Sequence, residues 1–202
     1  MLTVVQALTL RRIGLLTFGC VVLGLGVALL LTADLGSDGF STLVNGVTRA
    51  TGIDFVLSNV AVSLGFLLLA AARGLLPGLG TLVQVVVVGL TADIGLRVLE
   101  TPDSLLLQVL MLLAALPVLA VGIATYLGTH LGAGPAEAAA LAWDPPVPFR
   151  WSYSVVQGGG ALVGWLLGAT LGAGTVTVIL VLGSAVDLAG RLLRLDVRQQ
   201  RS

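Results

Sequence analysis

The sequence predicts an all-α membrane protein with six transmembrane helices, arranged as two inverted three-helix repeats. The first observation behind this prediction is composition: of 202 residues, 57% are hydrophobic and 10% are charged, and the mean hydropathy is +1.08. Soluble domains carry about 25% charged residues, so a lipid bilayer is the expected solvent. The second observation is an internal duplication, and the third is the distribution of the arginines.

The duplication consists of two pairs of matched segments. Gly78–Arg97 and Gly172–Arg191 lie 94 positions apart and are identical at seven of twenty positions, including a Gly-x-Gly-Thr start and an Asp-x-x-x-Arg end. Gly26–Gly36 and Gly122–Gly132 lie 96 positions apart and match at five of eleven positions. Matched blocks in the same order indicate an internal repeat. The single membrane domain therefore divides into repeats of residues 1–103 and 104–202.

Six stretches are near the roughly 20 apolar residues that cross a bilayer. Two arginines precede the first stretch, as in a secretory signal, but this stretch is too long for one and belongs to the repeat. Three spans in each repeat force the second repeat to enter the membrane from the opposite side, a plan typical of secondary transporters. The stretches are Ile13–Thr32, Phe55–Ala72, Gly74–Ala92, Ser104–Thr129, Trp151–Leu171 and Gly172–Val186.

The arginines predict the orientation. All ten basic residues are arginines, and a cytoplasmic start places eight of them inside and only Arg49 and Arg97 outside. This distribution obeys the positive-inside rule. We therefore expect a multi-pass protein of the bacterial cytoplasmic membrane with both termini in the cytoplasm. The lipid bilayer is its expected partner, and a net charge of zero argues against nucleic acid.

Two short apolar segments, within residues 37–50 and 134–145, occupy equivalent places in the repeats, each after a Leu-Gly pair. Both are too short to span the membrane. They are either re-entrant helices that line a cavity or amphipathic segments at the membrane surface. The re-entrant alternative predicts a substrate cavity between them.

The candidate substrate-binding residues surround these two segments. A helix that breaks in lipid frees backbone groups, which are tolerated mainly beside a cavity, and helix starts favour an anionic or polar group. The alternative is that these helix starts only turn tightly at the membrane surface. No cofactor is expected, and a single histidine cannot build a His-based metal site. The candidates are Asp34, Gly36, Asp38, Thr81, Tyr126, His130, Gly132, Gly134, Glu137 and Thr175.

Two further patterns predict structural contacts. Asp93 and Arg97, and likewise Asp187 and Arg191, are four residues apart, which places each pair on one helix face as an ion pair. A stripe of glycines at every fourth position predicts close helix packing. The sequence leaves open whether this stripe meets a helix of the same chain or a second copy in a homo-oligomer. The stripe comprises Gly160, Gly164, Gly168 and Gly172.

The second repeat carries four motifs that together resemble the YczE/YyaS/YitT-type bacterial integral membrane proteins, above all the YczE branch. These motifs are Tyr126, Leu131–Pro135, Gly164–Gly168 and Gly172–Thr175. The first repeat matches more weakly. The resemblance implies a multi-spanning membrane protein with no settled substrate. The chain departs from the family at Ala136-Glu137, where Arg-Asp is usual, and at Tyr153 and Gln157, where Arg and Glu are usual. An ion-coupled mechanism is therefore not implied.

The chain lacks the G-x-S-x-G, H-E-x-x-H and P-loop motifs, so we expect no enzyme. The inverted repeat favours a transporter or permease for an unidentified small molecule. The alternative is a non-transporting accessory subunit that packs against a membrane partner through the glycine stripe.

Overall fold

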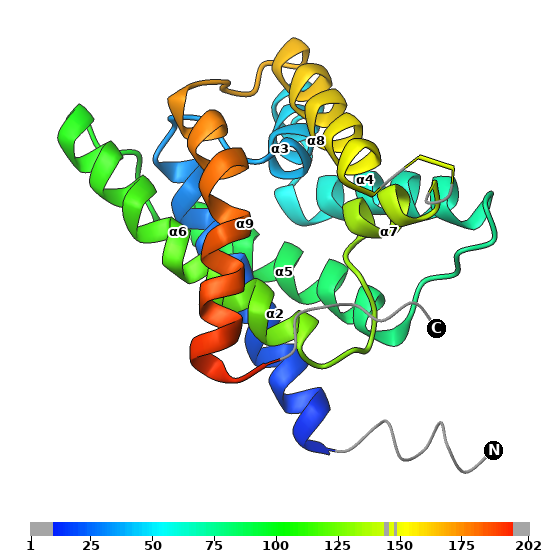
Figure 1. The fold of residues 1–202 in the computed structure, drawn as a ribbon. Helices are drawn as coiled ribbons and strands as arrows, with labels where there is room; N and C mark the ends of the chain where they lie inside the picture. The colour runs from blue at the N-terminus through cyan, green and yellow to red at the C-terminus, as the bar shows by residue number, and fades with distance from the viewer. Residues whose placement is uncertain (1–9, 144–145, 148, 196–202) are drawn as a thin grey trace.

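The computed structural model describes residues 10–143, 146–147 and 149–195, and within them the chain forms eight α-helices and no strand (Figure 1). The all-α prediction is confirmed, and every predicted span and short segment corresponds to a helix. The helices are α2 (Leu10–Thr32), α3 (Gly39–Thr51), α4 (Phe55–Ala71), α5 (Leu79–Val98), α6 (Leu105–Leu127), α7 (Pro135–Leu141), α8 (Phe149–Leu166) and α9 (Ala173–Leu193).

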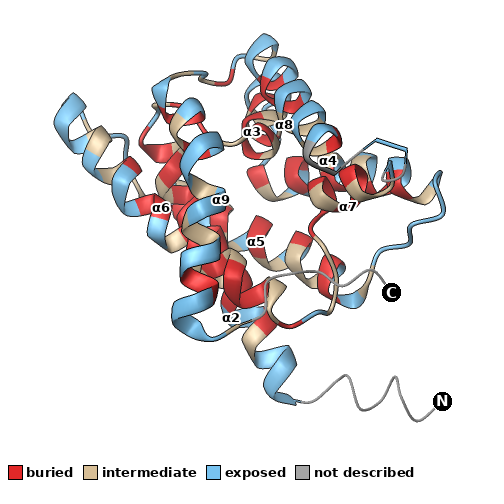
Figure 2. Ribbon diagram, in the orientation of Figure 1, coloured by how far each residue is buried: buried red, intermediate tan, exposed pale blue. Residues whose placement is uncertain are grey.

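Four of these helices, α2, α5, α6 and α9, are long and apolar enough to cross a membrane. The chain is therefore a membrane-spanning protein, but the predicted six spans are supported only for these four. Helix α4 is apolar but has 17 residues. Helix α8 has 18 residues but is less apolar, because Ser152, Ser154 and Gln157 interrupt its first turns. Exposed residues lie along the outer faces of the helices (Figure 2). Many of them are large and apolar, and lipid would cover them.

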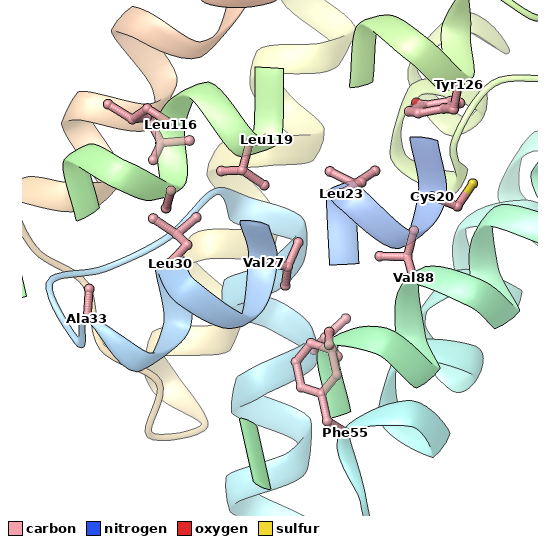
Figure 3. Close-up of a cluster of buried hydrophobic side chains, with 14 of the residues drawn as sticks. Cys20, Leu23, Val27, Leu30, Ala33, Phe55, Val88, Leu116, Leu119 and Tyr126 are labelled. Atoms are coloured by element: carbon pink, nitrogen blue, oxygen red, sulfur yellow. The ribbon is translucent and has the colours of Figure 1, made fainter. Parts of the chain in front are cut away.

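The helices pack in two groups. In the first group, α2 packs against α5 and α6, and α6 packs against α9. In the second, α3 packs against α8, α4 against α7, and each short helix against its neighbour in the other pair. Helix α2 carries the centre of the core: Leu23, Val27 and Leu30 face side chains of α5 and α6, with Phe55 of α4 beside them (Figure 3).

The packing pairs correspond to one another under the duplication. Helices α3 and α7 are equivalent, as are α4 and α8, yet α3 packs against α8 and α7 packs against α4. Each short helix therefore lies on the middle helix of the opposite repeat. The sequence does not predict that each short helix packs on the opposite repeat. Hydrophobic periodicity shows which face of a helix is buried, but not which helix covers that face.

The glycine stripe explains how closely α3 and α8 approach. A Cβ atom on Gly160 would lie 2.7 Å from the backbone oxygen of Gly39, and one on Gly164 would collide with the backbone of Thr42. The partner of the stripe is thus a helix of the same chain, which leaves no free stripe for an accessory partner. Gly172 meets the backbone of Leu35 instead. The assignment of Gly168 to the stripe is wrong, because α8 ends at Leu166 and nothing lies within 4 Å of a Cβ there.

The two Leu-Gly breaks have the same backbone form. Asp34 and His130 adopt left-handed φ angles of 52° and 54°, and the glycines that follow, Gly36 and Gly132, also have positive φ. Each break then contacts the start of the last helix of the opposite repeat. The Gly174 N–H donates to the Leu35 oxygen at 2.8 Å, and the equivalent Gly80 N–H donates to the Leu131 oxygen at 2.9 Å. The backbone groups freed by each break are thus satisfied by protein.

The two predicted ion pairs differ. Arg97 binds Asp93 at 2.9 Å and also Asp54 at 2.7 Å. Between Asp187 and Arg191, both within the described residues, no ion pair forms. Both side chains are exposed, and solvation competes with a pair that has no second carboxylate to fix the guanidinium.

Candidate functional site

A cavity of about 90 Å³ lies where the two helix groups meet. All eight helices contribute to its wall, and the two predicted short segments supply its acidic groups. Its apolar wall includes Leu23, Val27, Val88 and Leu119, which belong to the core in Figure 3. Its polar lining consists of Asp38, Ser41, Asn59, Ser63, Gln84, Tyr126, Glu137, Tyr153 and Gln157.

Each repeat places one carboxyl group at the start of its short helix. Asp38 is the N-cap of α3, and its Oδ2 accepts a hydrogen bond of 3.1 Å from the Ser41 N–H. In the second repeat the N-cap is Gly134, and Glu137 in the first turn of α7 folds back over it, where a Cβ would collide with the carboxylate. Both positions complement the partial positive charge of a helix start.

Hydrogen bonds through Tyr153 and Gln157 of α8 lead from Glu137 to the first turn of α3. The Glu137 carboxyl is hydrogen-bonded to the Tyr153 hydroxyl. The same hydroxyl lies 2.7 Å from Gln157 Nε2, which donates to it, and Gln157 Oε1 accepts from the Phe40 N–H at 3.1 Å. The backbone of Gly134 hydrogen-bonds to the Tyr126 hydroxyl, which ties α6 to the start of α7.

Burial decides the protonation of the two carboxyl groups, which lie in the short segments between the spans. It raises the pKa of Asp38, against the opposing hydrogen bonds from Ser41. It also raises the pKa of Glu137; the nearby Asp38 charge adds to this rise, while hydrogen bonds to the α7 backbone and Tyr153 oppose it. Carboxyl groups of this kind exchange protons closer to neutral pH than carboxyl groups in water do.

Two polar atoms of the cavity lining have no hydrogen-bond partner. They are Ser63 Oγ and Gln84 Oε1, and the Ser63 side chain is only 1% exposed. Neighbouring Asn59 is satisfied, because its Nδ2 donates to the Val85 oxygen at 2.8 Å. Buried polar atoms normally find a partner, so these two indicate a place for a bound group or water. Within the described residues, no three His, Cys, Asp or Glu side chains lie close enough to hold a metal ion.

Three of the predicted site residues line this cavity: Asp38, Tyr126 and Glu137. The helix-start threonines lie behind it, where Thr81 Oγ1 donates to the Ala133 oxygen at 2.7 Å. Gly36 and Gly132 let the backbone of each break lie against Thr175 and Thr81, because a Cβ at either glycine would collide with the threonine hydroxyl. The expectation that the Gly-x-Gly-Thr starts receive an anionic substrate is not supported, because backbone oxygens of the breaks already accept from Gly80 and Gly174.

Asp34 and His130 do not reach the cavity. Both are exposed, and Asp34 forms an ion pair of 3.5 Å with Arg49 and a hydrogen bond with Thr170. Their left-handed backbone ends the preceding helix, which leaves the side chain outside the helix group. The sequence reasoning missed Asn59, Ser63 and Gln84 as lining residues. The signal was present, since polar side chains inside apolar spans are functional candidates.

Comparison with known proteins supports a family of unestablished role. The model of a family described as "Family of unknown function (DUF6198)" matches residues 10–191. An "Uncharacterized protein" of Haemophilus influenzae (strain ATCC 51907 / DSM 11121 / KW20 / Rd) is 32% identical over 181 residues, which cover 88% of this chain and 82% of the relative. No solved structure matches the chain. Neither description carries the YczE name, so that resemblance stays an expectation from motifs. The match over most of its length shows that the chain belongs to the DUF6198 family.

Proposed function

We propose that the protein is a transporter of the bacterial cytoplasmic membrane and that the cavity between the two helix groups is its substrate site. The observation that carries this proposal is the lining of the cavity by every helix, with one carboxyl group from the short segment of each repeat. A non-transporting accessory subunit has no need for unpaired polar atoms at its centre, since such atoms destabilise a fold unless a partner satisfies them.

The relation between the repeats supports alternating access. If the repeats are inverted, the pseudo-two-fold axis relates the α3–α8 unit to the equivalent α7–α4 unit, and the two units pack against each other in one helix group. Helix α4 packs against α5, whereas the equivalent α8 and α9 make no comparable contact. In an inverted-repeat transporter, a difference in packing between equivalent helix pairs closes the cavity toward one side of the membrane and opens it toward the other. Exchange of the two arrangements would expose the cavity to the opposite side of the membrane.

This proposal requires α4 and α8 to cross the membrane together with the four longer helices, which places both termini in the cytoplasm. Helix α4 is one residue shorter than α8, and both lie within the range of roughly 17 to 25 residues known for spans. The accessory alternative loses its proposed surface, because α3 covers Gly160 and Gly164.

Cysteine accessibility tests the proposal directly. Cys20 is buried and is the chain's single cysteine, so a Cys20→Ala background leaves no thiol. In this background, Ser63→Cys and Gln84→Cys place a thiol on the cavity. We expect a small membrane-impermeant thiol reagent to label both from either side of oriented vesicles, as a cycling transporter requires. Leu68→Cys, on an exposed position of α4, is the control and should stay unlabelled in lipid.

Labelling of the cavity thiols from one side only, or from neither side, would contradict alternating access. The result does not depend on knowledge of the substrate, because the reagent reports only whether water reaches the cavity.

A further inference from the structure

We propose that the cavity selects a small organic cation, a protonated alkylamine with a short hydrocarbon chain. This inference rests on the proposed function, since it names the class of substrate for the same site. It follows from three properties of the described lining residues: their charge, their unpaired hydrogen-bond acceptors, and the volume and polarity of the wall.

The described part of the lining contains acidic groups and no basic ones. Asp38 and Glu137 line the cavity, and no Arg, Lys or His does so among the described residues. The ion pairs of the described residues involve neither carboxyl group. Their partners are neutral: the Ser41 N–H for Asp38 and the Tyr153 hydroxyl for Glu137. A partly buried carboxylate without a counter-ion is stabilised by a bound cation, whereas a bound anion would meet two like charges.

The acceptors match an ammonium group. Ser63 Oγ, on a side chain that is only 1% exposed, and Gln84 Oε1 have no partner. A primary ammonium carries three N–H donors and no acceptor, so its donors equal in number one carboxylate and these two oxygens. A carboxylate ligand offers only acceptors and would leave Gln84 Oε1 unsatisfied.

The wall limits the size and shape of the ligand. A cavity of about 90 Å³ is smaller than the roughly 150 Å³ that binds benzene, which leaves room for about four non-hydrogen atoms. Leu23, Val27 and Val88 give a hydrocarbon chain an apolar surface. Phe40 and Phe55 lie in the same lining, and aromatic faces attract an ammonium group.

The dependence on pH follows from the same groups. Four titratable side chains face the cavity: Asp38, Glu137, Tyr126 and Tyr153. Because burial raises the pKa of both carboxyl groups, lowering the pH makes them neutral and removes the attraction. An alkylamine, like lysine with a pKa of about 10.4, stays charged throughout. Amine affinity should therefore increase as the pH rises and the carboxyl groups ionise.

Calorimetric titration of the full chain in detergent tests the inference, with propylammonium as the probe. Sodium propionate, 1-propanol and sodium chloride serve as the matched anionic, neutral and inorganic comparisons. We expect propylammonium to bind at least about tenfold more tightly than the other three, because charge-assisted hydrogen bonds are about twice as strong as neutral ones.

Variants locate the binding. Asp38→Asn and Glu137→Gln keep the side-chain shape and should each weaken propylammonium binding at least about tenfold. Ser63→Ala, which removes only one unpaired oxygen, should weaken it less. Asp34→Asn is the control, since it makes the same change on an exposed acid outside the cavity. Its binding should equal that of the unchanged protein, and melting curves of all variants establish that they fold.

Three outcomes overturn the inference. They are propionate or sodium chloride binding as tightly as propylammonium, no response of propylammonium binding to either carboxyl variant, and no binding of propylammonium at pH 8. If the cavity thiols are nevertheless labelled from both sides, the transport proposal stands while the amine class fails. If labelling fails and the amine still binds, the cavity is a binding site in a protein that does not transport.

Discussion

The two repeats share their backbone plan but differ in how firmly their parts are joined. Thr81 at the start of α5 donates to the Ala133 oxygen of the second repeat, whereas the equivalent Thr175 at the start of α9 has no partner for its Oγ1. Helix α4 packs against α5, but α8 lacks comparable contact with α9. The same Gly-x-Gly-Thr motif thus occurs in a tight and in a loose setting, which is what a duplicated transporter requires if its halves exchange roles.

The short helices differ in length but are attached in the same way. Helix α3 has 13 residues, and α7 has 7. Each is fastened at its C-terminal end by an arginine of the first repeat: Arg49 Nη1 donates to the Gly168 oxygen at 3.2 Å, and Arg73 Nε donates to the Ala142 oxygen at 3.4 Å. Arg73 also lies 4.8 Å from the ring centre of Trp143. Hydrogen bonds between the repeats thus hold the C-terminal end of each short helix on the opposite repeat.

The largest predicted effect compares the two exchanged pairs through Gly164 and Ala70. Gly164→Leu should lower the free energy of unfolding by about 3 kcal/mol or prevent folding, because its side chain would collide with the backbone of Thr42. Ala70→Leu, in the buried contact of α4 with α7, should have a smaller effect of about 1–3 kcal/mol, since side chains there can shift. Denaturation in detergent measures both.

Gly158→Leu provides the control on the same helix as Gly164, because nothing lies within 4 Å of a Cβ at that position. It should leave the stability almost unchanged. A Gly164→Leu protein as stable as Gly158→Leu would mean that α3 and α8 do not approach closely, and the contrast between the exchanged pairs would disappear.

A second comparison concerns the helix-start threonines. Thr81→Val removes a hydrogen bond of 2.7 Å and leaves the Ala133 oxygen without its donor, which should lower the free energy of unfolding by about 1–2 kcal/mol. Thr175→Val removes a buried hydroxyl that has no partner, so it should be neutral or stabilising. Equal losses for the two variants would show that the repeats are joined with the same strength.

The helices were predictable from the sequence because long apolar runs are separated by Gly and polar breaks. The positions of α3 and α7 were also predictable, since each follows a Leu-Gly pair in the duplication. The number of spans was not, because α8 combines adequate length with several polar side chains. Gly168 shows a related limit: spacing placed it on the stripe, but its φ of 96° belongs to the turn after α8.

The site was predictable only in part. The short segments led to Asp38 and Glu137 because a carboxyl group near a break in lipid requires a polar environment. Asn59 and Gln84 were missed, because one polar residue in a span faces the cavity only when its neighbouring helix has been placed. Asp34 was assigned to the cavity by its equivalence to His130, yet both side chains are exposed. Equivalence within a repeat predicts backbone form better than it predicts side-chain environment.

The smallest predicted effect concerns the arginines that end α5 and α9. Arg97 binds both Asp93 and Asp54, and so connects the end of α5 with the residue before α4. Arg191 has no ion pair with Asp187. Arg97→Gln should therefore lower the melting temperature slightly, with a smaller difference at high salt because the pairs are exposed and screened. Arg191→Gln should leave the melting temperature unchanged at any salt concentration. If the two variants melt alike at low salt, the Asp93–Arg97–Asp54 contact contributes nothing to stability, and the firmer attachment of α5 rests on the Thr81 hydrogen bond and on its packing against α4.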